Sequence, residues 1–292
     1  MSFHKNGNLS ARGWITGVFV LSMLGLVTAA TSCSSGPQLP QPGTPAFYWA
    51  AARETYRVGD FVKASENLQR ILVGENEFSA RARAWDAVIS SGLAQGYMEL
   101  ADAWEAGARS NRLNPTPFRK QVSALRALAS ASAIQFAEDV HRVVAANKDP
   151  KILLAFTYPT GPLAKPAGLK KVAGGIPVQD SERDLLQAAM LQRGVLLSVC
   201  AAVGSRDDAA AAQGKLVAGD FLASRDVFLL AAAQSLSDES ELFTGTKLDL
   251  PNRLKILSQE ALEVLGAVPQ SKETKTLNDK IQVRLKKARL SI

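Results

Sequence analysis

Histidine and cysteine are scarce in this chain of 292 residues. The histidines are His4 and His141, and the cysteines are Cys33 and Cys200. If the N-terminal segment is removed on export, His141 alone remains, which excludes metal sites built from several histidines. A histidine-based catalytic triad would also have only this residue to use. We therefore expect no metal and no cofactor.

Tyrosine and tryptophan do not occur after Tyr158, and the charges are balanced over most of the chain. The formal net charge is +7, but residues 272–292 alone carry seven basic and two acidic side chains. A nucleic-acid-binding domain would need a basic stripe with aromatic residues across its body, and none is present. Glycan cleavage by paired carboxylates is disfavoured because its sites usually offer aromatic platforms.

Strand patterns are also rare, whereas alanine-rich and leucine-rich runs are common and hydrophobic residues make up 47% of the chain. This composition favours helices around a sizeable core. We predict an all-α fold.

The N-terminus has the composition of an export signal. Lys5 and Arg12 precede an apolar run without charges at 14–30, which is close to the lower length limit for crossing a membrane. Small residues follow directly before Cys33, so residues 1–32 are predicted to be a signal peptide. Ordinary cleavage after Ser32 and an uncleaved anchor are the alternatives.

The sequence Ala30-Thr31-Ser32-Cys33 resembles a bacterial lipobox. The resemblance implies that Cys33 is lipidated, for example with palmitate, and becomes the first residue of a lipoprotein. Such a protein is anchored to a membrane of the bacterial cell envelope and faces the periplasm, with the outer membrane favoured over the inner one. Residues 33–45 are rich in proline and glycine and would form a flexible tether.

A spaced pattern of small and aromatic residues occurs twice in the body. The first copy covers 52–72 around Gly59-Asp60-Phe61, the second covers 212–232 around Gly219-Asp220-Phe221, and a weaker third copy lies near Gly96. The pattern resembles the tetratricopeptide repeat, which implies antiparallel helical pairs stacked as an α-α superhelix. Phe61 and Phe221 would then have equivalent places at the starts of helices.

Breaker residues divide the body into two predicted halves. The N-terminal half covers 46–147, with helical pairs at 47–72 and 77–109 and a long helix from Thr116 to about Asn147. A Pro/Gly-rich loop follows at 148–180, with a short helical turn at 151–156. The C-terminal half covers 181–292, where the helix ending at Val203 is apolar on most sides and should be buried.

The candidate binding residues are aromatic or basic. Tryptophan is common in binding hot spots, so Trp49, Trp85 and Trp104 are candidates for contacting a partner, although we favour core packing for each of them. His141 is interpreted as a helix-surface residue rather than a general base, and Cys200 as a buried packing residue rather than a reactive thiol.

The terminal helix at 272–292 combines an apolar face with a basic arc. We expect Leu277, Ile281, Leu285 and Ala288 to pack inward. The basic arc, including Lys286, Lys287 and Arg289, could attract an acidic partner or anionic lipid headgroups, or could only keep the end of the array in solution.

These features together indicate a lipid-anchored envelope adaptor that binds another protein through a tetratricopeptide-like helical surface. We expect no enzymatic activity and no catalytic residues. The alternative is an envelope enzyme or a small-ligand carrier with a site near the 157–180 loop.

Overall fold

The computed structural model describes residues 40–146, 148–206 and 208–289. Cys33, the predicted signal peptide and most of the tether lie outside these ranges. Residues 39–292 form one compact unit, and the predicted all-α fold is confirmed. The described helices are α1 (Pro45–Arg57), α2 (Phe61–Ile71), α3 (Ser79–Ser110), α4 (Thr116–Ala146), α5 (Gly168–Ala173), α6 (Asp180–Ala202), α7 (Ala209–Lys215), α8 (Arg225–Glu239), η1 (Ser240–Phe243), α9 (Pro251–Gly266) and α10 (Lys272–Arg289).

The first helical pair forms as its sequence pattern predicts. Gly59 has a φ of 82°, which suits glycine in the turn between α1 and α2. The Asp60 side chain caps α2 by accepting a hydrogen bond from the Lys63 backbone N–H. The rings of Tyr56 and Phe61 meet edge to face at 5.4 Å between centroids, so aromatic packing closes the seam between the helices.

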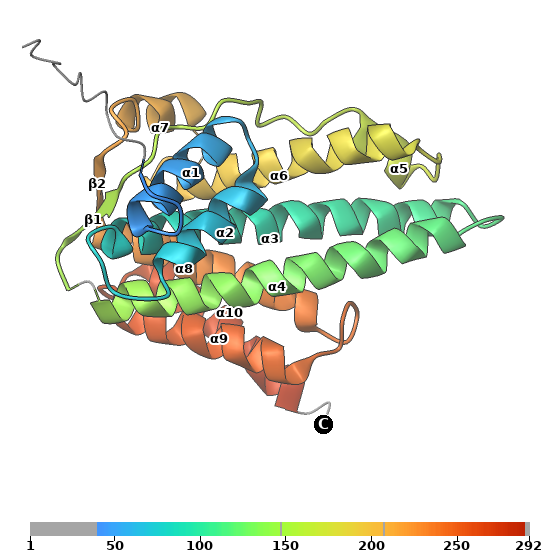
Figure 1. The fold of residues 1–292 in the computed structure, drawn as a ribbon. Coiled ribbons are helices and arrows are strands. Elements are labelled where there is room, and N and C mark those ends of the chain that lie inside the picture. Colours follow the sequence, from blue (N-terminus) through green and yellow to red (C-terminus); the bar gives the residue numbers. More distant parts are fainter. Residues whose placement is uncertain (1–39, 147, 207, 290–292) are drawn as a thin grey trace, which may run out of the picture. The chain divides into compact units, whose positions relative to one another are not determined.

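The centre of the structure is α3, which runs without interruption for 32 residues (Figure 1). The prediction of two shorter helices separated near Gly96 is therefore wrong. The glycines serve helix packing instead, because a Cβ on Gly92 would lie 2.4 Å from the Val195 Cα, and one on Gly194 would lie 2.1 Å from the Gly92 oxygen. Glycines at this crossing allow α3 and α6 to approach closely.

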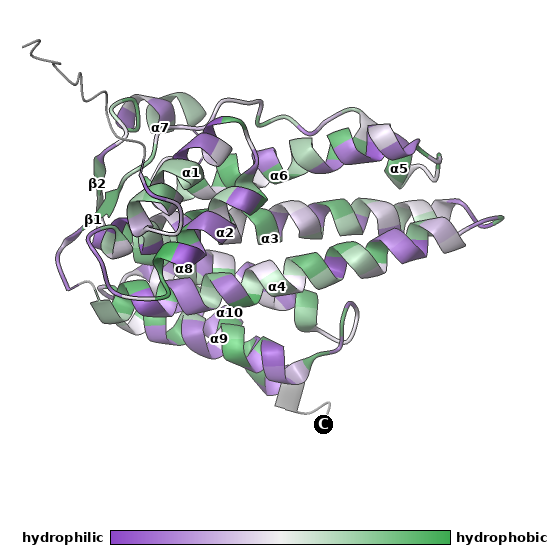
Figure 2. Ribbon diagram, in the orientation of Figure 1, coloured by the Kyte–Doolittle hydropathy of each residue, from purple (hydrophilic) through white to green (hydrophobic). Residues whose placement is uncertain are grey.

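An antiparallel partner to α3 is the predicted long helix, α4, which begins at Thr116 and ends at Ala146 (Figure 1). Phe118, Val122, Leu125 and Phe136 of α4 are buried. Figure 2 shows apolar and polar residues alternating along α4 and α9, as in amphipathic helices with one buried face. Residues from both predicted halves contribute to one core.

Two short strands replace predicted helical segments. Residues 151–156 were expected to form a helical turn, but β1 (Lys151–Leu154) pairs antiparallel with β2 (Phe221–Ser224) in the register Lys151↔Ser224 to Leu154↔Phe221. The second Gly-Asp-Phe turn is thus followed by a strand rather than a helix. Gly219 keeps a positive φ of 79°, so the turn is shared while the element after it differs.

The packing around α3 differs from a linear stack of pairs. This one helix contacts α2, α4, α5, α6 and β1, whereas a repeat in a solenoid contacts only its neighbours. The predicted superhelix is not confirmed.

Within the described ranges, α6 is the one helix whose length and apolar composition would suffice to cross a membrane. Of its most apolar stretch of 18 residues, 56% is buried inside the fold. Together with the close contact between Gly92 and Gly194, this burial shows that α6 packs into the core against α3, as the sequence predicts for a buried helix.

Candidate functional site

A groove of about 500 Å³ lies between α10 and the loop at 244–250. Its floor is apolar, because Phe243 and Leu254 are buried in the core beneath it. Val283 of α10 also lines the groove and is 52% exposed. Charged residues form the remaining wall, namely Glu241, Lys247, Asp249, Lys280, Arg284 and Lys287.

The wall formed by α10 is positioned by its apolar face. Leu277, Ile281 and Leu285 are buried, as predicted, and α10 packs on α8 and α9. Nothing is described of the Ala288 side chain, the fourth residue of that predicted face. Burial of one face leaves the basic arc of α10 directed away from the core.

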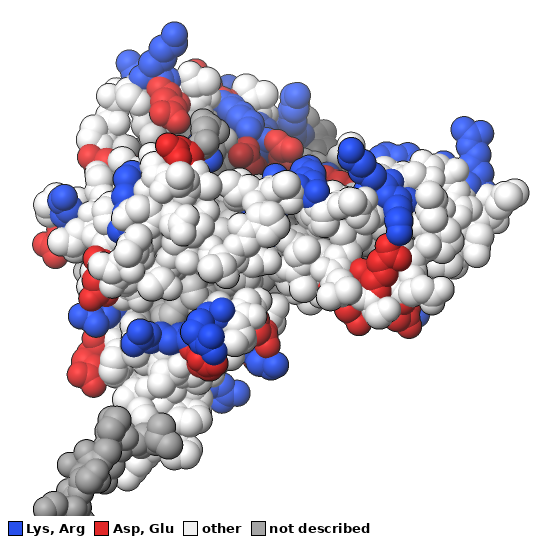
Figure 3. All heavy atoms as spheres, turned by 90° about the horizontal axis from the view of Figure 1, so that it is seen from above, with Lys and Arg blue, Asp and Glu red and all other residues white. Residues whose placement is uncertain are grey.

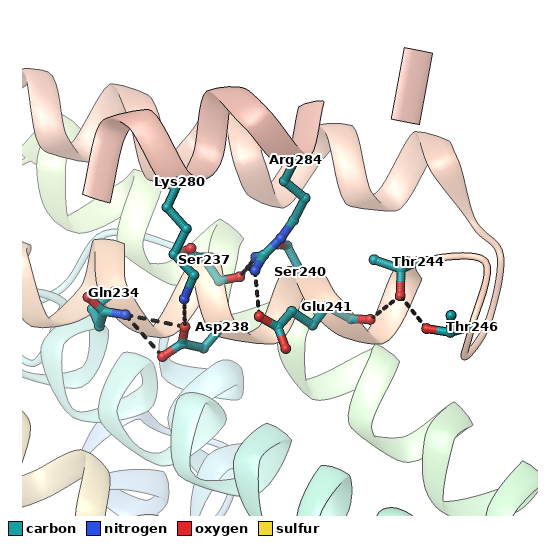
Figure 4. A network of polar contacts seen from close by, with 9 residues as sticks. All are labelled: Gln234, Ser237, Asp238, Ser240, Glu241, Thr244, Thr246, Lys280 and Arg284. Carbon is teal, nitrogen blue, oxygen red and sulfur yellow. Dashed lines mark hydrogen bonds and ion pairs between the residues drawn. The ribbon is translucent and has the colours of Figure 1, made fainter. Parts of the chain in front are cut away.

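Polar contacts fix α10 against the end of α8 (Figure 4). The Lys280 Nζ donates to the Asp238 Oδ1 at 2.8 Å, and the Arg284 Nη1 donates to the Ser240 Oγ at 2.6 Å. Arg284 also donates to the Ser237 carbonyl and pairs with Glu241. Since only 14% of the Arg284 side chain is exposed, this contact network holds the groove wall in place.

The opposite wall is a loop with a strained backbone. Asp249 has a φ of 50°, which among the described non-glycine residues is the one positive value. Backbone hydrogen bonds impose this conformation, since Asp249 N donates to Thr244 O at 3.0 Å and Leu250 N donates to Phe243 O at 3.1 Å. Strain of this kind occurs at binding sites, where the surrounding structure fixes it.

The groove combines features that suit a peptide segment of another protein. An apolar floor and the exposed Val283 can bury an apolar anchor. Four cations and two carboxylates line the walls, and two of the cations, Lys247 and Lys280, also pair with Asp102 and Asp238 beside the groove. The ammonium groups have several donors each and can still bind acidic groups of a ligand.

The predicted basic residues fall unequally around this groove. Lys286 and Lys287 are both exposed on α10, but only Lys287 lines the groove. Arg289 is the last residue of α10, and its side chain lies outside the description. Cys33 lies outside the described ranges. The sequence pattern located the basic wall of the groove but not the loop that faces it.

Two of the three candidate tryptophans belong to the core. Trp85 and Trp104 are 1% and 5% exposed, so their proposed role as partner contacts is wrong. Trp49 is partly buried, and its ring stacks on Phe78 and meets Trp85 edge to face. All three tryptophans therefore have a packing role. Trp85 and Trp104 belong to the hydrophobic core, and Trp49 packs against it.

The single histidine of the body lies in a cluster with two glutamates. The His141 Nδ1 on α4 lies 3.3 Å from the Glu260 Oε2 and 4.0 Å from the Glu263 Oε1 on α9. These side chains can place three ligand atoms within 4.8 Å of one another. Both glutamates come from a helix that is remote in sequence, so neighbouring residues gave no sign of the cluster.

Cys200 is buried, as predicted, and forms no disulfide with another described residue. Its Sγ lies 3.9 Å from the Tyr158 hydroxyl. Burial raises the pKa of the Cys200 thiol, which disfavours the reactive thiolate. The structure therefore supports the packing role.

The loop at 157–180, considered above for an enzymatic or carrier site, is held by α3 and α6. Arg193 Nε donates to Leu163 O at 2.8 Å, and Glu99 pairs with both Arg193 and Lys165. Burial acts to raise the pKa of Glu99, but hydrogen bonds from the two cations outweigh it and lower the pKa. A carboxylate neutralised in this way fastens the loop and is unsuited to be a general acid.

Comparison of the chain with protein-family models, curated proteins and solved structures found no match.

Proposed function

We propose that this protein is a lipid-anchored adaptor of the bacterial cell envelope, which holds an acidic segment of another envelope protein in the groove beside α10. The lipobox-like sequence ending at Cys33 supports the anchor. The groove, with an exposed apolar side chain between basic residues, is the observation that carries the proposed binding activity.

The partner segment is expected to combine an apolar anchor with acidic neighbours. Val283 and the floor would bury the anchor, whereas Lys280 and Lys287 on the same wall would attract its carboxylates. The contact network of Arg284 leaves α10 little freedom to move, so less conformational entropy is lost on binding. Catalysis is not part of the proposal, and the adaptor would act by binding alone.

A cross-linking pull-down from envelope fractions tests this function with the full-length, tethered protein. We expect a discrete complex that Val283→Glu removes, because the new carboxylate would enter the apolar part of the groove. Ile256→Glu is the matched control, since Ile256 is 51% exposed on α9 but does not line the groove. A complex that survives both changes, or no complex with the unchanged protein, would contradict the proposed function.

A further inference from the structure

The loop between α3 and α4 exposes apolar side chains at the end of the α3–α4 hairpin. Leu113 is 100% exposed and Ile176 is 55% exposed. Ile176 follows a segment that is fastened to this loop, because Asn111 Nδ2 donates to Gly175 O at 3.0 Å and Ser110 Oγ donates to Ala173 O at 3.2 Å. Two exposed apolar residues therefore belong to one end of the fold.

Basic side chains without counter-charges surround these apolar residues. They are exposed and have no ion pair within the part of the chain that the structure describes; they are Arg109, Arg112, Arg119, Lys120 and Lys170. Figure 3 shows Lys and Arg side chains standing out at the end where α5 lies in Figure 1, together with Asp and Glu side chains and beside a broad uncharged surface.

The acidic side chains at the same end are already paired. Glu105 binds Arg126 at 2.6 Å and Glu182 binds Lys171 at 2.9 Å, while Asp180 and Asp184 share Arg183, at 2.9 and 3.6 Å. The unpaired cations are thus not neutralised by these acids, and the end has an excess of positive charge.

The arginines also line a cleft of about 620 Å³ between the two helices and the 244–250 loop. Arg126 lies in the wall of this cleft with 8% exposure. Its Nη2 binds Glu105, but its buried Nε has no hydrogen-bond partner among the described residues. Guanidinium groups with free donors are suited to binding phosphate oxygens.

We propose that this end of the molecule binds an anionic lipid bilayer through a hairpin tip, defined as Arg109, Arg112, Leu113, Arg119, Lys120 and Ile176. Leu113 and Ile176 would enter the boundary between headgroups and acyl chains, while the arginines contact the lipid phosphates. An apolar apex with basic side chains around it matches a bilayer, where the acyl chains lie beneath the phosphates. A soluble acidic molecule has no apolar layer to receive Leu113.

The proposal goes beyond the adaptor function and depends neither on the groove beside α10 nor on Cys33. The hairpin tip lies at the C-terminal end of α3, while α1 packs near its start through Trp49 and Phe78. At about 1.5 Å per residue, the 32 residues of α3 separate these ends by about 48 Å.

Vesicle binding by a soluble form that begins at residue 40 and retains the compact unit tests the proposal. We expect binding to vesicles that contain phosphatidylglycerol, weaker binding to phosphatidylcholine vesicles, and loss of binding as salt increases. Arg109→Gln, Arg112→Gln and Arg119→Gln together should weaken binding by about 100-fold, since each basic residue near an anionic surface contributes about fivefold. The control with the same charge change is Lys272→Gln, Lys275→Gln and Lys286→Gln on α10.

Insertion can be measured separately with a polarity-sensitive fluorophore on Leu113→Cys. Cys200 is buried, so labelling is directed to the new thiol. We expect a blue shift on anionic vesicles for the fluorophore at position 113. We expect none for the same fluorophore on Val73→Cys, because Val73 is 89% exposed but precedes α3.

Equal binding to both lipids, loss of binding only with the α10 variant, or binding to a soluble polyanion without a blue shift on vesicles would overturn the proposal. Circular dichroism checks that each variant is folded.

Discussion

Asp86 on α3 and Asp139 on α4 are both fully buried, and the two carboxyl groups influence each other's titration. Two buried carboxyl groups that interact in this way do not both ionise readily, so the pair tends to keep a proton. Burial raises the pKa of Asp86 to about 7, against hydrogen bonds from Ser65 and Asp139 that lower it. Burial and the neighbouring charge of Asp86 raise the pKa of Asp139 well above its usual range.

The free energy of unfolding should therefore fall as the pH rises from about 4 to about 7. Over this interval the folded protein retains protons that the unfolded chain has lost, so the stability is fully present at low pH and is lost towards neutral pH. Glu239 contributes in the same direction, because burial raises its pKa as well. Gln135 and Arg142, which face Asp139, and Gln69, which lies near Asp86, stabilise charged carboxylates and limit the effect.

Asp86→Asn should reduce this pH dependence and stabilise the fold at about pH 8, because the amide needs no proton to stay neutral when it is buried. Urea unfolding across the pH range measures both effects. Asp180→Asn, at a carboxyl that is 87% exposed, serves as the control. Identical pH profiles for the Asp86 variant and the unchanged protein would contradict the assignment of the shared proton.

Gly194→Ala should destabilise the fold by about 1–3 kcal/mol or more, because a Cβ at 2.1 Å from the Gly92 oxygen forces α3 and α6 apart. Gly214→Ala in α7 is the matched control, since a Cβ there meets nothing within 4 Å. The control should be neutral or slightly stabilising, as alanine favours helices. Thermal unfolding measures both effects. Equal melting temperatures for the two variants would refute the close contact between α3 and α6.

Phe61→Ala and Phe221→Ala should now have unequal effects. Phe61 is 2% exposed and packs on Tyr56, so its loss should cost about 3–5 kcal/mol. Phe221 is the first residue of β2 and is only partly buried, so its loss should cost about 1–2 kcal/mol. Equal shifts in the denaturant midpoint would instead favour the equivalence that the repeat pattern suggested.

Features that depend on neighbours in sequence were predictable. The turn at Gly59, the helix starting at Thr116 and the buried face of α10 follow from capping and periodicity, and the structure has all three. The pairing of β1 with β2 was not predictable in this way, because the partners of its first ladder position, Lys151 and Ser224, are far apart in sequence.

The position of Gly96 was misleading for a related reason. Glycine is common in turns, which suggested a turn at Gly96. In the structure, the missing side chain of Gly96 instead allows α3 to approach the backbone of Met190. Asp86 and Asp139 had no predicted role, because aspartate usually faces solvent and only the pairing of α3 with α4 places the two residues together. The groove was half predicted, since the basic arc of α10 has a local pattern whereas the loop carrying Asp249 has none.

Cys33→Ser should release the protein from membranes after cleavage, because the lipid on Cys33 is the proposed anchor. Fractionation of the envelope, together with the mature N-terminus measured by mass spectrometry, checks this prediction. Unchanged membrane retention with an unchanged N-terminus would refute lipidation at Cys33. The hairpin-tip variant in the same background separates retention by the lipid from retention by the basic surface.

Photo-cross-linking in intact cells tests the central claim, that the groove beside α10 holds a partner protein. A photoreactive residue at Val283 should yield one adduct of defined mass, while the same residue at Ile256 should yield none. Lys287→Glu should weaken the adduct, because Lys287 lines the groove that attracts acidic groups. No adduct at Val283, or the same adduct from both positions, would contradict the claim.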